Sequence, residues 1–228
     1  MKTFYLIAAF AFLPCMLTLS KPGVSDHLET YKNHRYKKDA KGVLLVYAGS
    51  FKSPQFSYDI GIRVEIDSSL GVRYNVVFEN GDNVMSQTAL FYKFSNPNKI
   101  IFYNFLTHQS MIHNCCGSAG GGSNVKPVGK DAIGKYNCTH VQGINNNERR
   151  AEDYWVSTQV PGYLLLLKIL KGIGPGYKQM FVNEYIFQWG GLVKMTSTSH
   201  GQMAANINLI EANTTMDFPA SDFDVPSN

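Results

Sequence analysis

The chain has 228 residues, of which 44% are hydrophobic and 17% are charged, and its formal net charge is +4. This length and composition fit a globular protein with a sizeable core, and the small positive excess is too weak to indicate a nucleic-acid-binding protein. Only 4 cysteines are present, which excludes a small scaffold built on disulfides.

The first twenty residues have the parts of an export signal. Lys2 supplies the positive start, Phe4–Leu19 is an uncharged apolar run, and Ser20 is small enough for a cleavage site. We therefore expect a signal peptide over residues 1–20, with a retained membrane anchor as an alternative. Lipid attachment at Cys15 is a further alternative, although Pro14 is an unfavourable residue before a lipidated cysteine.

The predicted mature chain begins with a polar segment over residues 21–41 and continues as strands. The basic cluster between Lys32 and Lys41 is interpreted as a solvated segment before the first strand. Alternation of apolar and polar residues predicts strands farther on, and an Asn80-Gly81 pair predicts a hairpin turn. The strands expected before the middle of the chain are Tyr58–Asp67, Val72–Phe78, Val84–Phe94 and Ile100–Leu106.

A flexible, Gly-rich loop is expected over residues 107–130, within a single domain that covers residues 42–226. Strand patterns resume after this loop. One nearly apolar segment, Pro161–Ile173, predicts a helix that begins at a proline and ends in glycines. The later strands are expected over Ile133–Val141, Ala151–Thr158, Met180–Trp189, Leu192–Thr198 and Met203–Ala212.

These elements predict a mainly β fold. About nine or ten antiparallel strands would form a strongly bent sheet or half-barrel. The apolar helix needs cover on most of its circumference, so we expect it to lie against the concave face of the sheet.

Three short segments resemble a known family: Gly134–His140, Ala151–Ser157 and Met216–Pro226. They are similar to the DUF4412 family of exported bacterial proteins, which look related to the outer-membrane lipoprotein carriers with the LolA/LolB-like fold. The resemblance covers roughly residues 42–226. It implies a half-barrel whose apolar cavity, in the carriers, receives acyl chains, and it implies a location in the periplasm or cell envelope.

Candidate ligand-binding residues are aromatic and aliphatic. Trp155 and Trp189 are expected to line a ligand cavity, and Leu164, Leu167 and Leu170 are expected to form an apolar lid over it. The alternative interpretation is that all five are ordinary core residues.

One cluster of sulfur and imidazole side chains has a different chemistry. His113, Cys115, Cys116 and His140 are of the types that bind zinc or copper. A disulfide between Cys138 and either Cys115 or Cys116 is the competing hypothesis, and free thiols are a third.

No nucleophile-elbow, zinc-protease or phosphate-binding motif occurs in the sequence. The favoured hypothesis is therefore a non-catalytic exported protein, without a cofactor, that binds a lipid or another hydrophobic ligand. The first alternative is a secreted protein-interaction module with a filled core, which contacts an envelope protein partner through its loops or a sheet edge. The second alternative is a metal-binding envelope protein.

Overall fold

The structure is a computed structural model that describes residues 42–52, 56–114, 125–145, 150–172, 184–199 and 202–226. The predicted signal peptide over residues 1–20 and the polar segment over residues 21–41 lie outside the described residues.

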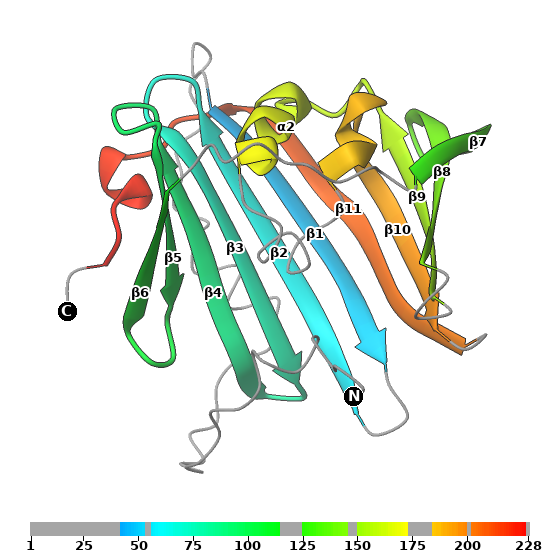
Figure 1. The fold of residues 1–228 in the computed structure, drawn as a ribbon, viewed down its shortest axis with the longest axis horizontal. Helices are drawn as coiled ribbons and strands as arrows, with labels where there is room; N and C mark the ends of the chain where they lie inside the picture. Colours follow the sequence, from blue (N-terminus) through cyan, green and yellow to red (C-terminus); the bar gives the residue numbers. More distant parts are fainter. Residues whose placement is uncertain are drawn as a thin grey trace.

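Within the described part of the chain, eleven antiparallel strands form one bent, open sheet (Figure 1). The strand order is β6-β5-β4-β3-β2-β1-β11-β10-β9-β8-β7, so each half of the chain builds one half of the sheet and β1 pairs with β11 in the middle. The strands are β1 (Gly42–Lys52), β2 (Ser57–Asp67), β3 (Gly71–Asn80), β4 (Asn83–Lys93), β5 (Lys99–Asn104), β6 (Gln109–Asn114), β7 (Val125–Ile133), β8 (Tyr136–Asn145), β9 (Arg150–Ser157), β10 (Gly191–Ser199) and β11 (Gln202–Met216).

The mainly β, bent-sheet fold predicted from the sequence is confirmed, and its strands differ from the expected ones in several places. The described strands exceed the nine or ten expected. The loop expected over residues 107–130 contains two strands at its ends, β6 and β7, and its middle lies outside the described residues. Neither strand shows an alternating pattern of apolar and polar residues. Both lie at the edges of the sheet, where most of their side chains are exposed.

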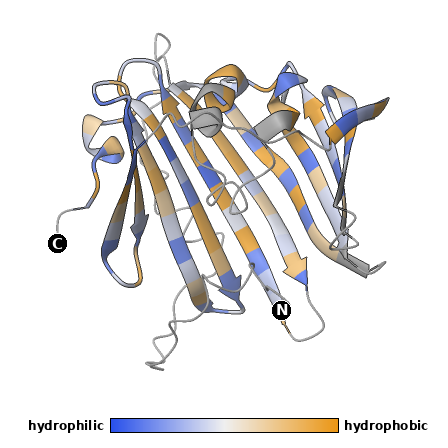
Figure 2. Cartoon of the chain, in the orientation of Figure 1, coloured by the Kyte–Doolittle hydropathy of each residue, from blue (hydrophilic) through white to orange (hydrophobic). Residues whose placement is uncertain are grey.

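Hydrophobic and hydrophilic residues alternate along the central strands (Figure 2), and alternate side chains of a strand point to opposite faces of the sheet. In β2, Ile60, Ile62, Val64 and Ile66 belong to the main core cluster. The hairpin to β3 is held by Asp67, whose Oδ1 accepts hydrogen bonds from the backbone N–H groups of Ser69 and Leu70 at 2.8 Å and 3.0 Å. The predicted Asn-Gly turn also forms, with Gly81 at φ 58° between β3 and β4.

Register shifts accompany the bend of the sheet. They interrupt five of its ladders, including the central β1–β11 pair between Val46 and Tyr47. A β-bulge increases local twist and bends the strand that carries it, so these shifts help the sheet curve around its core.

Two helical segments lie on the concave face at one end of the sheet (Figure 1). Helix α2 (Tyr163–Gly172) confirms the predicted helix, and the 3-10 helix η1 (Glu184–Gln188) packs against it and against β9 and β10. The strand expected over Met180–Trp189 is wrong where the structure describes it. Ile186 and Phe187 are consecutive and both buried, a pattern that a strand with alternating faces cannot provide.

The convex face is covered in part by the C-terminal segment. A second 3-10 helix, η2 (Ala220–Phe223), packs on β3 and β4. Phe218 and Phe223 join Leu44, Val46 and Met216 in a small second core there. No helix of the described residues is long and apolar enough to cross a membrane.

Candidate functional site

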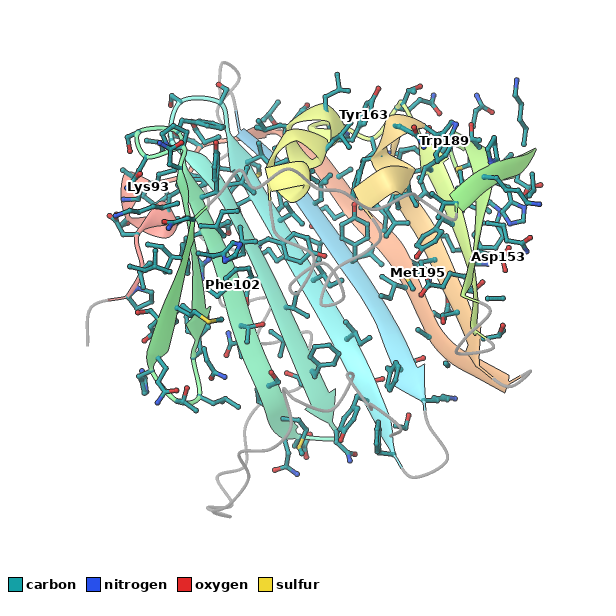
Figure 3. All side chains as sticks on the ribbon, viewed as in Figure 1. Lys93, Phe102, Asp153, Tyr163, Trp189 and Met195 are labelled. Carbon is teal, nitrogen blue, oxygen red and sulfur yellow. The ribbon has the colours of Figure 1, made fainter. Side chains whose placement is uncertain are left out.

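Of the core clusters formed by the described residues, the largest lies on the concave face of the sheet. Buried side chains on it come from both halves of the sheet and form a single cluster. Phe102 of β5 and Met195 of β10 lie toward opposite sides of this face (Figure 3). We use the term concave apolar face for the side chains of Tyr47, Ile60, Ile62, Val64, Tyr74, Val76, Leu90, Phe102, Tyr154, Met195 and Ile207.

These side chains are less than a tenth exposed. The concave apolar face is therefore packed, rather than open to solvent, in this structure.

Side chains are closely packed at the end of this face that α2 and η1 cover. Leu166 of α2 is 3% exposed, and Ile186 and Phe187 of η1 are 0% and 4% exposed. Gly162 begins the turn into α2 at φ 75°, and a Cβ placed there would lie 2.6 Å from Cδ1 of Ile66 in β2. Glycine is thus required on both conformational and steric grounds where α2 meets the sheet.

Two buried phenols place polar groups within the concave apolar face. Tyr47 donates a hydrogen bond from its hydroxyl to the carbonyl oxygen of Leu192 at 3.2 Å. Burial raises the pKa of both Tyr47 and Tyr74 well above the usual range, and for Tyr47 the nearby Tyr74 and Tyr136 add to the effect. Both hydroxyls therefore stay protonated and uncharged at physiological pH.

An aromatic group marks the opposite end of the sheet, at the connection between β1 and β2. The rings of Phe51 and Phe56 stack with centroids 6.1 Å apart, and those of Phe56 and Tyr58 lie 4.9 Å apart. Phe56 is 38% exposed. The apolar surface thus continues from the buried concave apolar face to an accessible aromatic side chain.

The predicted ligand-binding residues lie in different surroundings. Leu167 and Trp189 are half-buried and pack against the main core, and Trp189 and Tyr163 lie at the end that α2 and η1 cover (Figure 3). Leu164 is 65% exposed. The side chain of Leu170 lies outside the described residues.

Trp155 is the centre of a cross-strand stack on β8, β9 and β10. His140 stacks on its ring at 4.6 Å with an interplanar angle of 9°, and Nζ of Lys194 lies 4.9 Å from the ring centroid. The indole Nε1 donates to Asp131 at 2.8 Å, and Nε2 of His140 lies 2.8 Å from Asp153. These contacts fix the orientation of the indole ring.

The predicted metal ligands are only partly described. His113 lies on β6 and His140 on β8, near opposite edges of the sheet, whereas Cys115 and Cys116 lie outside the described residues. Among the described residues, no group of three or more His, Cys, Asp or Glu side chains is arranged to hold a metal ion. The structure therefore does not bring the two histidines together, and the zinc or copper site stays a prediction.

Cys138 is a buried free thiol, 3% exposed, and it is the only cysteine that the structure describes. Its Sγ lies 3.7 Å from the carbonyl oxygen of Tyr136. Burial raises the pKa of this thiol. Because both candidate partners lie outside the described residues, the disulfide also stays a prediction.

The convex face of β2 and β3 carries buried charges that the sequence pattern did not reveal. Nε of Arg63 lies 2.6 Å from Oε1 of Glu65, and Arg73 lies 3.7 Å from the other oxygen of that carboxylate. Asn75 and Glu79, on the same face of β3, are 2% and 1% exposed. Alternation predicts that these side chains point away from the main core, but it does not predict that they are buried.

Comparisons with known proteins give a likeness of fold alone. No family model matches the chain, DUF4412 included, and no curated protein matches it. A solved structure of PNGF-II is 12% identical, with a TM-score of 0.44, and the match covers 81% of this chain and 29% of that chain. This chain thus spans less than a third of the PNGF-II chain.

Two further solved structures are similar over most of their own length. A domain from Vibrio parahaemolyticus, described as an outer membrane lipoprotein-sorting protein, is 9% identical with a TM-score of 0.37, and the match covers 82% of this chain and 91% of that chain. A LolA superfamily protein from Nitrosomonas europaea is 9% identical with a TM-score of 0.34, with coverages of 88% and 96%. At these values the likeness concerns the sheet, and it carries no argument about ligands.

Proposed function

We propose that this chain is an exported, non-catalytic protein of the periplasm or cell envelope that binds a hydrophobic ligand, such as a lipid or an acyl chain. Residues 42–226 form its single domain in this proposal. The ligand binds along the concave apolar face, and the exported state follows from the predicted signal peptide.

One observation carries the proposal. The concave apolar face is a single cluster that draws on both halves of the sheet, while α2 and η1 pack on each other and on β9 and β10 at one end. An apolar chain that replaces the present contacts of this face gains about 25 cal/mol for each Å² of its own surface that leaves water. The ligand enters at the opposite end, past Phe51 and Phe56.

The predicted residues take specific roles in this proposal. Leu167 and Trp189, which pack against the core at the helical end, contact the far end of the ligand. Tyr47 keeps its hydrogen bond to the carbonyl oxygen of Leu192, so its ring, and not its hydroxyl proton, faces the ligand. Trp155 keeps its indole ring in the stack with His140 and Lys194, so it supports β9 rather than the ligand.

Native mass spectrometry of the mature protein purified from its own host tests the proposal. We expect a bound lipid mass that is lost on denaturation, and binding of a fluorescent acyl-chain probe by the delipidated protein. The variant Phe51→Gln should weaken probe binding about tenfold, because a buried apolar contact is worth roughly 1.5 kcal/mol.

The matched control is Ile210→Gln, which changes an apolar side chain that is 61% exposed and belongs to none of the core clusters. A bare polypeptide mass together with no probe binding refutes the carrier function. If Phe51→Gln and Ile210→Gln weaken probe binding equally, the concave apolar face is not the binding surface.

A second function is favoured by the edge strand β6. Met111 and Ile112 in this strand are 47% and 60% exposed, and β6 contains no proline or lysine. The opposite edge, β7, carries Pro127 and a register shift beside it. Proline and bulges block edge-to-edge pairing, so the two edges differ in their capacity to accept another strand.

This contrast supports a protein-interaction function, in which a strand of an envelope protein partner pairs with the edge strand β6. The test is cross-linking with a photoreactive amino acid at Ile112 in the native host, with the same group at Val128 of β7 as the matched exposed control. A partner captured at β6 but not at β7 favours this function. Cross-linking to the same proteins at β6 and β7 excludes this function.

A further inference from the structure

Two carboxylates face each other on the convex side of the sheet. Asp59 of β2 and Glu79 of β3 are directly opposite in the antiparallel register. Their chain neighbours Ile60 and Phe78 point to the concave face and pack with the main core, so both carboxylates point the other way. Side chains paired in this manner have Cβ atoms about 4.5–5.5 Å apart, and like charges at that spacing repel.

The part of the chain that the structure describes offers Glu79 no cation or hydrogen-bond donor to offset this repulsion. Glu79 is 1% exposed, and among the described residues neither of its carboxylate oxygens has a hydrogen-bond partner. Asp59 is exposed, and within the described residues it forms no ion pair. Lys52 of β1 lies on the same face and is also exposed, and none of the ion pairs between described residues joins it to either carboxylate. A buried, unsatisfied carboxylate is rare enough to require an explanation, and a bound ion is one.

More oxygen donors extend the row on which the two carboxylates lie. Ser50 of β1 is opposite Asp59, and Asn206 of β11 is opposite Ser50. The amide Oδ1 of Asn206 is held by a 3.3 Å hydrogen bond from Nδ2 of Asn208. Four neighbouring strands thus present one hydroxyl, one amide and two carboxylate side chains at the same level of the convex face.

We infer that Asp59 and Glu79 bind a hard divalent cation, calcium, with the hydroxyl of Ser50 as a further ligand. Calcium takes six to eight oxygen ligands at about 2.3–2.6 Å in flexible geometry, which suits carboxylates supplied by neighbouring strands. Its two positive charges balance the two carboxylates. The exposed Asp59 leaves one side of the site open to water, which completes the coordination.

Calcium titration of chelator-treated mature protein tests the site. Sites with few charged ligands in exported proteins have dissociation constants of about 10⁻⁴–10⁻³ M. At ten times that concentration we expect the melting temperature to rise by roughly 3 °C. Isothermal titration should give one bound ion per chain.

The variant Glu79→Gln should bind calcium at least about tenfold more weakly, because glutamine keeps the shape and removes the charge. The control Glu211→Gln changes an exposed carboxylate on β11 and should bind as wild type does. Circular dichroism of both variants verifies that they are folded. Absence of a melting shift and of binding heat in the wild type overturns the inference. Wild-type affinity in Glu79→Gln, or an equal loss in Glu211→Gln, also overturns it.

Discussion

The isosteric substitution Glu79→Gln should stabilise the protein at alkaline pH, when it is measured in chelator and without added cation. Burial, and secondarily the charge of Asp59, raise the pKa of Glu79 from 4.5 to about 7. The folded state therefore holds the proton of Glu79 more tightly than the unfolded state does. The stability that this proton contributes is complete at acidic pH and is lost as pH rises from about 4.5 through about 7.

The magnitude follows from the shift. One unit of pKa is worth about 1.4 kcal/mol, so a rise from 4.5 to about 7 amounts to about 3 kcal/mol over the whole titration. Part of this loss has already occurred at about pH 5, which leaves roughly 2 kcal/mol between about pH 5 and about pH 8. Glutamine does not titrate, so the variant lacks this loss.

The assay is urea unfolding of wild type and Glu79→Gln at several pH values between these limits. The difference in unfolding free energy, variant minus wild type, should grow by roughly 2 kcal/mol in favour of the variant as pH rises. Other carboxylates titrate equally in both proteins and cancel. A difference that stays constant with pH would refute the description of Glu79 as a buried, unpaired carboxylate, and Glu211→Gln serves as the exposed control.

Three further predictions concern the rest of the fold. Leu45→Ala should reduce the unfolding free energy by about 2–5 kcal/mol in urea melts, because Leu45 is fully buried in the main core. Gly71→Ala should cost at least about 2 kcal/mol in the same assay, since φ is +155° there and the new Cβ would lie 2.0 Å from the carbonyl oxygen of Tyr92. The thiol of Cys138 should resist alkylation by iodoacetamide in the native protein and react after denaturation, because it is buried and its pKa is raised. Peptide mass analysis locates the label, and rapid labelling of Cys138 in the native protein would contradict its buried position.

The parts of the fold that alternation specifies were predictable. Strands β2 and β3 carry apolar residues at every second position and form the hairpin expected of them. Helix α2 begins near a proline and is apolar on most of its surface, and it lies on the concave face as expected. Segment 184–188 was misread because a short apolar run has no period that separates a strand from a buried helical turn.

The site was less predictable because it depends on register. Asp59 and Glu79 are twenty residues apart in the sequence, and only the pairing of β2 with β3 places them opposite each other. Trp155 was expected to line a cavity, but its indole is held by Asp131, 24 residues away. Composition identifies the aromatic residue, whereas only the three-dimensional arrangement shows which group satisfies its N–H.

The inferred cation site lies on the convex side of β2 and β3, and its two carboxylates are next in the chain to side chains that pack with the main core on the concave side. Asp59 precedes Ile60 in β2, and Glu79 follows Phe78 in β3. A cation that ties the two carboxylates together should therefore suppress local opening of this end of the β2–β3 pair. In hydrogen exchange, calcium should slow the backbone amides of residues 58–61 and 77–79, while those of residues 64–66, near α2, exchange as before. Uniform slowing across both strands would indicate global stabilisation and would contradict a local tie at Asp59 and Glu79.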